Sequence, residues 1–184
     1  MDQYLTDSDV RVLGALIEKQ VTTPDNYPLS LNALIAACNQ SSNRHPVVAY
    51  DEETVLAAIQ RLRRASMVRA IQRSDSRVTK YEHIATDTLD LSSNELGLMC
   101  VLMLRGPNTI GELRTRTERL ARFESLADVE TTLNRRDAAT TSGFQEAIRV
   151  ANPVVSTRAR GPSCSRHERS ETGHRGRVRA DRRI

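Results

Sequence analysis

The sequence repeats one pattern of capped, amphipathic segments at an offset of 86 residues. Thr6 with Asp9, and Ser92 with Glu95, each form a capping signature, in which a hydroxyl residue is followed three positions later by a carboxylate. An internal repeat of this length predicts two copies of one small helical unit. Apolar residues follow both caps at helical spacing: Val10, Leu13, Leu16 and Ile17 in the first copy, and Leu96, Met99, Leu102 and Met103 in the second.

Three helices are predicted in the first copy, around a passage that contains two prolines. Pro24 and Pro28 forbid a continuous helix between the first two, so this passage should be an extended loop or a short strand. Ser30 caps the second helix, Cys38 completes its apolar stripe as a core residue, and Asp51 begins the third helix. The expected bounds are 7–19, 30–39 and 52–65.

A β-hairpin is predicted directly after the third helix. The runs MVRAI and RVTKYEHI are rich in β-branched residues and are separated by a short polar turn. Three helices followed by a hairpin give the winged-helix order, so the first domain is expected at 1–87. The hairpin residues expected to face inward are Val68, Ile71, Val78 and Tyr81.

The second copy follows the same order but stops before its hairpin. Thr109 with Glu112 repeats the capping signature before a second helix, and Ser125 caps a third. No hairpin pattern follows, so the second domain is expected at 88–134 without a wing. The predicted fold class is mainly α with small β-hairpin wings, arranged as two tandem winged-helix (helix-turn-helix) domains of which the second is incomplete.

The composition changes abruptly at residue 135. Residues 135–184 contain twelve Arg but no Leu and no Lys, whereas residues 1–134 contain eighteen Leu. A tract so poor in apolar residues cannot offset its chain entropy by burial, so we expect it to be disordered. Because the change falls inside a helix that the repeat should continue, we also hypothesise that the tract is translated out of frame. One of the gene's other two frames should then encode a Leu-containing helix end and a hairpin.

The net charge of +4 does not by itself indicate nucleic-acid binding, because the positive charge is unevenly placed. Residues 1–134 carry 15 Lys and Arg against 18 Asp and Glu, whereas residues 135–184 carry 12 against 5. The helical units are therefore net acidic. DNA binding by these units has to be argued from local surfaces.

One long motif resembles a known bacterial family. The stretch EKQVTTPDNYPLSLNALIAACNQSSNRHPV at 18–47, with RVTKYEH in the hairpin and FESLADVETTL in the second copy, is similar to the YceH-like family of tandem winged-helix proteins. The resemblance covers about residues 4–134, although Ser41 replaces a lysine that is usual in the family and the second wing is not recognisable. It implies the tandem fold but no activity, because the family has no assigned biochemical function.

Double-stranded DNA is the leading predicted partner, bound by the third helix and the wing of the first domain. In such folds this helix enters the major groove while wings and basic side chains hold phosphates. The acidic start of the helix argues against DNA binding, and arginines paired with neighbouring carboxylates would look the same in the sequence. The candidate contacts are Arg44, Gln60, Arg61, Arg64, Arg69, Arg73, Arg77 and Lys80.

The polar passage between the first and third helices is the second candidate surface. Its side chains either brace turns or recognise a protein or nucleic acid, and the sequence leaves both readings open. The alternative function is therefore a protein-interaction or scaffold module, which binds a partner protein or a second copy of the chain. The candidates are Thr22, Thr23, Asn26, Tyr27, Asn39, Gln40 and Asn43.

Catalysis, cofactors and membranes are disfavoured by the sequence. No histidine belongs to a recognisable set with a nucleophile and an acid, and no glycine-rich phosphate loop occurs. Cys164 and His167 have a C-x-x-H spacing without a second pair, so no metal site is expected. No apolar run approaches the ~18 residues that a membrane span needs. We therefore expect a cytoplasmic binding protein that is not an enzyme, with transcriptional regulation as the leading hypothesis.

Overall fold

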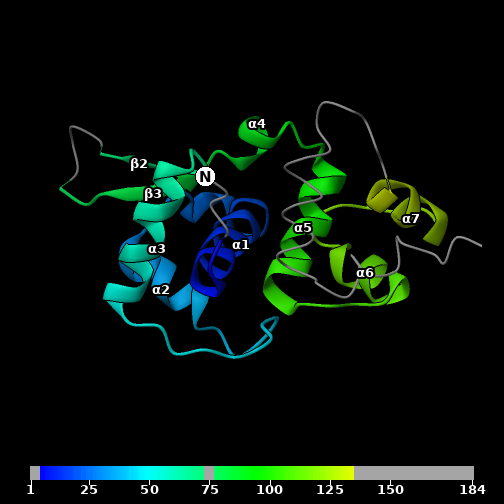
Figure 1. The fold of residues 1–184 in the computed structure, drawn as a ribbon, viewed down its shortest axis with the longest axis horizontal. Coiled ribbons are helices and arrows are strands. Elements are labelled where there is room, and N and C mark those ends of the chain that lie inside the picture. The colour runs from blue at the N-terminus through cyan, green and yellow to red at the C-terminus, as the bar shows by residue number, and fades with distance from the viewer. Residues whose placement is uncertain (1–4, 73–76, 135–184) are drawn as a thin grey trace, which may run out of the picture.

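The structure is a computed structural model that describes residues 5–72 and 77–134. These residues form seven α-helices, one 3₁₀ helix and three short strands, which confirms the mainly helical fold class (Figure 1). The first unit contains α1 (Asp7–Thr22), η1 (Pro24–Asn26), β1 (Leu29–Ser30), α2 (Leu31–Cys38), α3 (Glu52–Arg64), β2 (Val68–Ile71) and β3 (Lys80–His83). The rest contains α4 (Ala85–Leu89), α5 (Ser93–Arg105), α6 (Ile110–Thr117) and α7 (Leu126–Asn134).

The helix boundaries follow from local capping. Thr6, Ser92 and Thr109 each form a capping box with the carboxylate three residues later. The helix α1 continues to Thr22, beyond the predicted end at residue 19, because only the residue before Pro24 is pushed out of the helical region.

The three strands form one antiparallel sheet in the order β1-β3-β2. The hairpin pairs Val68 with His83, and β1 adds Leu29 opposite Tyr81, so the proline-marked passage does contain a short strand. Val68 is buried as expected, but Val78 is 54% exposed. Pairing begins only at Lys80, so Val78 precedes the strand whose pleat would have turned it inward.

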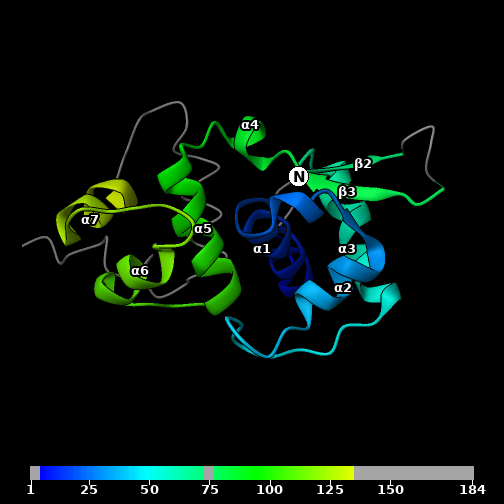
Figure 2. The same ribbon diagram turned by 180° about the vertical axis from the view of Figure 1, so that it is seen from behind.

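The two repeated units pack through their equivalent helices, α1 and α5. Both views place these helices side by side at the centre, with α3 on one side of the pair and α7 on the other (Figures 1 and 2). The Cys100 thiol donates to the carbonyl oxygen of Gly14 at 3.5 Å. These positions are 86 residues apart, which is the offset of the repeat. Contact between equivalent positions is a property of two-fold packing, so the units form a pseudo-symmetric pair.

One hydrophobic core runs through both units. Leu16 of α1 and Leu102 of α5, which are equivalent in the repeat, are both essentially inaccessible to solvent. Cys38 is also fully buried, which confirms its predicted core role, and burial raises the pKa of its thiol to about 12. The expected domain boundary between residues 87 and 88 lies within α4, and the division into two domains stays a prediction.

Several predictions concern residues outside the described ranges. They are the DNA contact assigned to Arg73, the disordered or out-of-frame tract at 135–184, and the C-x-x-H pair Cys164 and His167.

Candidate nucleic-acid interface

Basic side chains occur on the last turn of α3 and on the wing that follows it. Arg61, Arg63 and Arg64 all lie in that last turn, where positive charge is favoured by the helix dipole. The exposed or half-buried cations of this region that form no salt bridge within the described ranges, together with Gln60 on α3, are here called the basic ridge: Gln60, Arg63, Arg64, Arg77 and Lys80.

Arg63 belongs to the basic ridge but was not among the predicted contacts. It is exposed, as are Gln60 and Arg64. Its position could have identified it as a candidate, because it lies in the same terminal turn as Arg64 and directly follows the buried Leu62.

Two of the predicted contacts are paired with carboxylates. The Nε of Arg61 lies 2.9 Å from Oδ1 of Asp9, whose side chain is buried, and 40% of the Arg61 side chain remains exposed. Arg69 forms a salt bridge with Glu82 on the neighbouring strand. These two arginines therefore fit the alternative in which arginines pair with neighbouring carboxylates instead of contacting DNA. They are less available to phosphates than the cations of the basic ridge.

Arg44 lies inside the molecule rather than on a surface. Its side chain has no exposed area, and its Nη2 lies 2.6 Å from Oε2 of Glu18. The guanidinium also donates to the carbonyl oxygen of Ala37 and to Oε1 of Gln40, both at 2.8 Å. Because its donors are directed inward, Arg44 is excluded from the DNA-contacting set. This burial was not predictable from the sequence, since Glu18 is 26 positions away.

Most of the second candidate surface braces the fold. The amide of Asn39 pairs with both backbone groups of Tyr50 at 2.8 Å, and the hydroxyl of Tyr27 accepts the His83 amide hydrogen at 2.7 Å. The hydroxyls of Thr22 and Thr23 donate to carbonyl oxygens of the preceding turn of α1. The turn-bracing reading therefore accounts for these side chains.

The segment between α2 and α3 also connects the two units. The His45 amide donates to the Leu104 carbonyl oxygen at 2.8 Å, and Arg105 donates to the side chain of Asn43. From the other side, the buried guanidinium of Arg11 donates to the Pro46 carbonyl oxygen at 2.7 Å. Of the predicted loop residues, Asn26 is exposed and makes no side-chain hydrogen bond within the described ranges.

His83 is the titratable group of the wing that burial affects most. Its side chain is buried, and burial lowers the pKa to about 4, although Glu82 and Asp87 act in the opposite direction. The folded protein therefore resists protonation of a group that titrates near pH 6.5 when unfolded.

The stability of the protein should consequently fall as the pH is lowered. Between pH 6.5 and 4 the unfolded state binds a proton at His83 that the folded state does not, which costs on the order of 2–3 kcal/mol by pH 4. Urea unfolding at several pH values should show this loss of stability. The variant His83→Gln should lack the part of the loss that comes from His83. Parallel pH profiles for both proteins would contradict the assignment.

Within the described ranges, no helix combines the length and hydropathy needed to cross a bilayer. The same residues contain no group of three or more His, Cys, Asp or Glu side chains placed to hold a metal ion.

Comparison with known sequences identifies the family. Residues 5–151 match the family described as "Protein of unknown function, DUF480". The chain belongs to this family. The match agrees with the resemblance of the 18–47 motif and extends beyond residue 134, where that resemblance was expected to end.

Relatives in the DUF480 family are similar to this chain over most of its length. A "UPF0502 protein" of Solibacter usitatus is 54% identical over 73% of this chain and 65% of its own length. Others from Opitutus terrae and Vibrio vulnificus are 50% and 52% identical, over 56% and 63% of their own lengths. The chain thus spans less than two thirds of the length of these relatives, and their names assign no activity.

Proposed function

We propose that the chain is a DNA-binding protein of the transcriptional-regulator type, which engages duplex DNA through the basic ridge. The main support for this proposal is that the cations of the basic ridge make no salt bridge within the described ranges. By contrast, Arg44, Arg61 and Arg69 are each paired with a carboxylate. An unpaired exposed cation can neutralise a phosphate without first breaking an internal contact. In this role the chain acts in the cytoplasm and is not an enzyme.

The charge distribution along α3 favours one mode of approach. Asp51, Glu52 and Glu53 at its start are exposed, and phosphates would be repelled there. Hydrogen bonds from the Thr54 side chain and from the Thr54 amide lower the pKa of the Asp51 carboxyl, so the charge persists at neutral pH. DNA would therefore meet the last turn of α3 and the wing, with Gln60 available for a base edge.

Removing two ridge cations should weaken DNA binding. The variant Arg64→Gln with Arg77→Gln, in a 1–134 fragment, should bind a duplex about tenfold or more weakly at ~0.1 M salt, because each lost phosphate contact removes favourable counterion release. Fluorescence anisotropy measures the affinity. The fragment is used because the twelve Arg of residues 135–184 would bind DNA nonspecifically.

A matched variant keeps this test specific. Arg119→Gln with Arg122→Gln removes the same charge from exposed residues of the second unit. Its affinity should equal that of the parent fragment, and equal weakening by both variants would place the contact elsewhere.

The second candidate function is a protein-interaction module. It is favoured by the acidic balance of residues 1–134, which carry 15 basic against 18 acidic side chains. A fragment that fails to bind DNA, yet captures a specific protein or forms a dimer, would support this role.

A further inference from the structure

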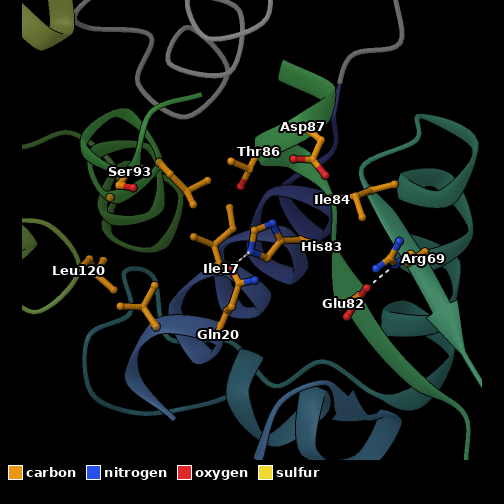
Figure 3. Close-up of a pocket in the computed structure, with 13 residues that line it drawn as sticks. Ile17, Gln20, Arg69, Glu82, His83, Ile84, Thr86, Asp87, Ser93 and Leu120 are labelled. Carbon is orange, nitrogen blue, oxygen red and sulfur yellow. Dashed lines mark hydrogen bonds and ion pairs between the residues drawn. The ribbon is translucent and has the colours of Figure 1, made fainter. Parts of the chain in front are cut away.

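A cavity of about 540 Å³ lies between the base of the wing and the second unit (Figure 3). Its walls include Gln20 of α1, His83 of β3, Thr86 and Asp87 of α4, and Ser93 of α5. The volume is within the range of sites that bind small molecules, about 300–1,000 Å³. None of the residues that line it belongs to the basic ridge, so the cavity is independent of the proposed DNA contact.

One buried polar atom of the cavity wall has no hydrogen-bond partner within the described ranges. Nε2 of His83 lies 2.5 Å from Oε1 of Gln20. In this orientation of the Gln20 amide its oxygen faces Nε2 and can only accept, so Nε2 carries the proton and Nδ1 presents a lone pair. Among the residues that the structure describes, none forms a hydrogen bond with this Nδ1, although His83 is 95% buried. A buried acceptor without a donor is rare in folded proteins, and it points to a missing group that donates a hydrogen.

The charged groups around the imidazole are mostly carboxylates. Glu82 and Asp87 both line the cavity with His83, and their charges act on the imidazole (Figure 3). Of the described residues that line the cavity, Arg69 is the one with a cationic side chain, and it is paired with Glu82. Asp87 is exposed and forms no ion pair within the described ranges, so its negative charge is uncompensated.

The apolar walls restrict the size and shape of an occupant. Ile17, Leu96 and Leu120 contribute hydrocarbon surface, and Leu120 lies across the cavity from Arg69 in Figure 3. A short aliphatic chain can cover this surface while a polar end reaches His83 and Asp87.

We propose that this cavity binds a small organic amine. Its N–H donates to Nδ1 of His83, its positive charge faces the carboxylates of Asp87 and Glu82, and its carbon chain packs on the apolar wall. An anion of the same size would meet the charge of Asp87, and an uncharged alcohol would gain nothing from it. The amine would touch both the wing and the second unit.

Three probes of equal length and different charge test the proposal on the full chain. They are 1,4-diaminobutane, 1,4-butanediol and succinate, titrated at pH 7 by calorimetry and by NMR of the His83 ring nitrogens. The diamine should bind saturably and shift the Nδ1 resonance, whereas the diol and succinate should bind at least tenfold more weakly. Equal binding of the three probes, or no saturable binding of the diamine, would overturn the proposal.

Two variants separate this site from charge attraction in general. Asp87→Asn changes an exposed side chain and should weaken diamine binding at least tenfold, while Glu130→Gln, which removes an exposed carboxylate from α7, should leave it unchanged. Unchanged affinity in Asp87→Asn, or equal weakening in both variants, would overturn the assignment. DNA binding by the basic ridge can fail without affecting this result.

Discussion

Replacing Glu18 with glutamine should lower the free energy of unfolding by about 3 kcal/mol or more. The substitution keeps the shape of the side chain but leaves the Arg44 guanidinium without its carboxylate. That guanidinium has no exposed area, and 13% of the Glu18 side chain is exposed, so water cannot replace the lost charge. Urea denaturation at pH 7 measures the change.

A matched carboxylate provides the control for Glu18. Glu118 is exposed on the second unit and forms no salt bridge within the described ranges, so Glu118→Gln should leave the denaturation midpoint unchanged. Replacing Glu18 and Arg44 together with methionine should cost less than the sum of the single replacements, because no unpaired charge is then buried. Equal stability of the Glu18 and Glu118 variants would contradict the role of this ion pair.

Gly14→Leu should destabilise the protein by about 3 kcal/mol, because it places a side chain where the two units touch. A Cβ at Gly14 would lie 3.0 Å from Cδ2 of Leu104 and 3.1 Å from Cβ of Met103. The latter atom is fixed to the backbone of α5, so the helices have to separate. Thermal unfolding measures the loss.

Gly111 is the matched glycine for this substitution. It also lies in a helix, but apart from its chain neighbours and its own helix backbone, no atom of the described residues lies within 4 Å of an added Cβ. Gly111→Leu should therefore be neutral or slightly stabilising, since glycine is the weaker helix former. A tolerated leucine at Gly14 would mean that α1 and α5 do not pack as closely as their contact indicates.

Features that depend on neighbouring residues were predictable from the sequence. The caps at Thr6, Ser92 and Thr109 satisfy amides three residues away, and their side-chain chemistry alone locates the helix starts. The repeat likewise placed equivalent apolar residues on α1 and α5, which the structure joins in one core.

Features that depend on distant residues were not predictable. Arg44 was expected to face DNA because a single sequence does not show that Glu18 lies beside it. The motif at 18–47 was notable for its polar residues, and the structure explains most of them as braces, including the bond from the His45 amide to α5. The cavity around His83 needs groups from α1, β3, α4 and α5 together, and no spacing along the chain indicates that meeting.

The salt dependence of duplex binding by the 1–134 fragment tests the central claim most directly. If the four cations of the basic ridge each neutralise a phosphate, the logarithm of the association constant should fall with the logarithm of salt concentration, with a slope of about −3 to −4. The slope should become shallower by about 2 when Arg64 and Arg77 become glutamine. Absence of measurable binding at low salt, or a slope that these replacements leave unchanged, would contradict DNA recognition through the basic ridge.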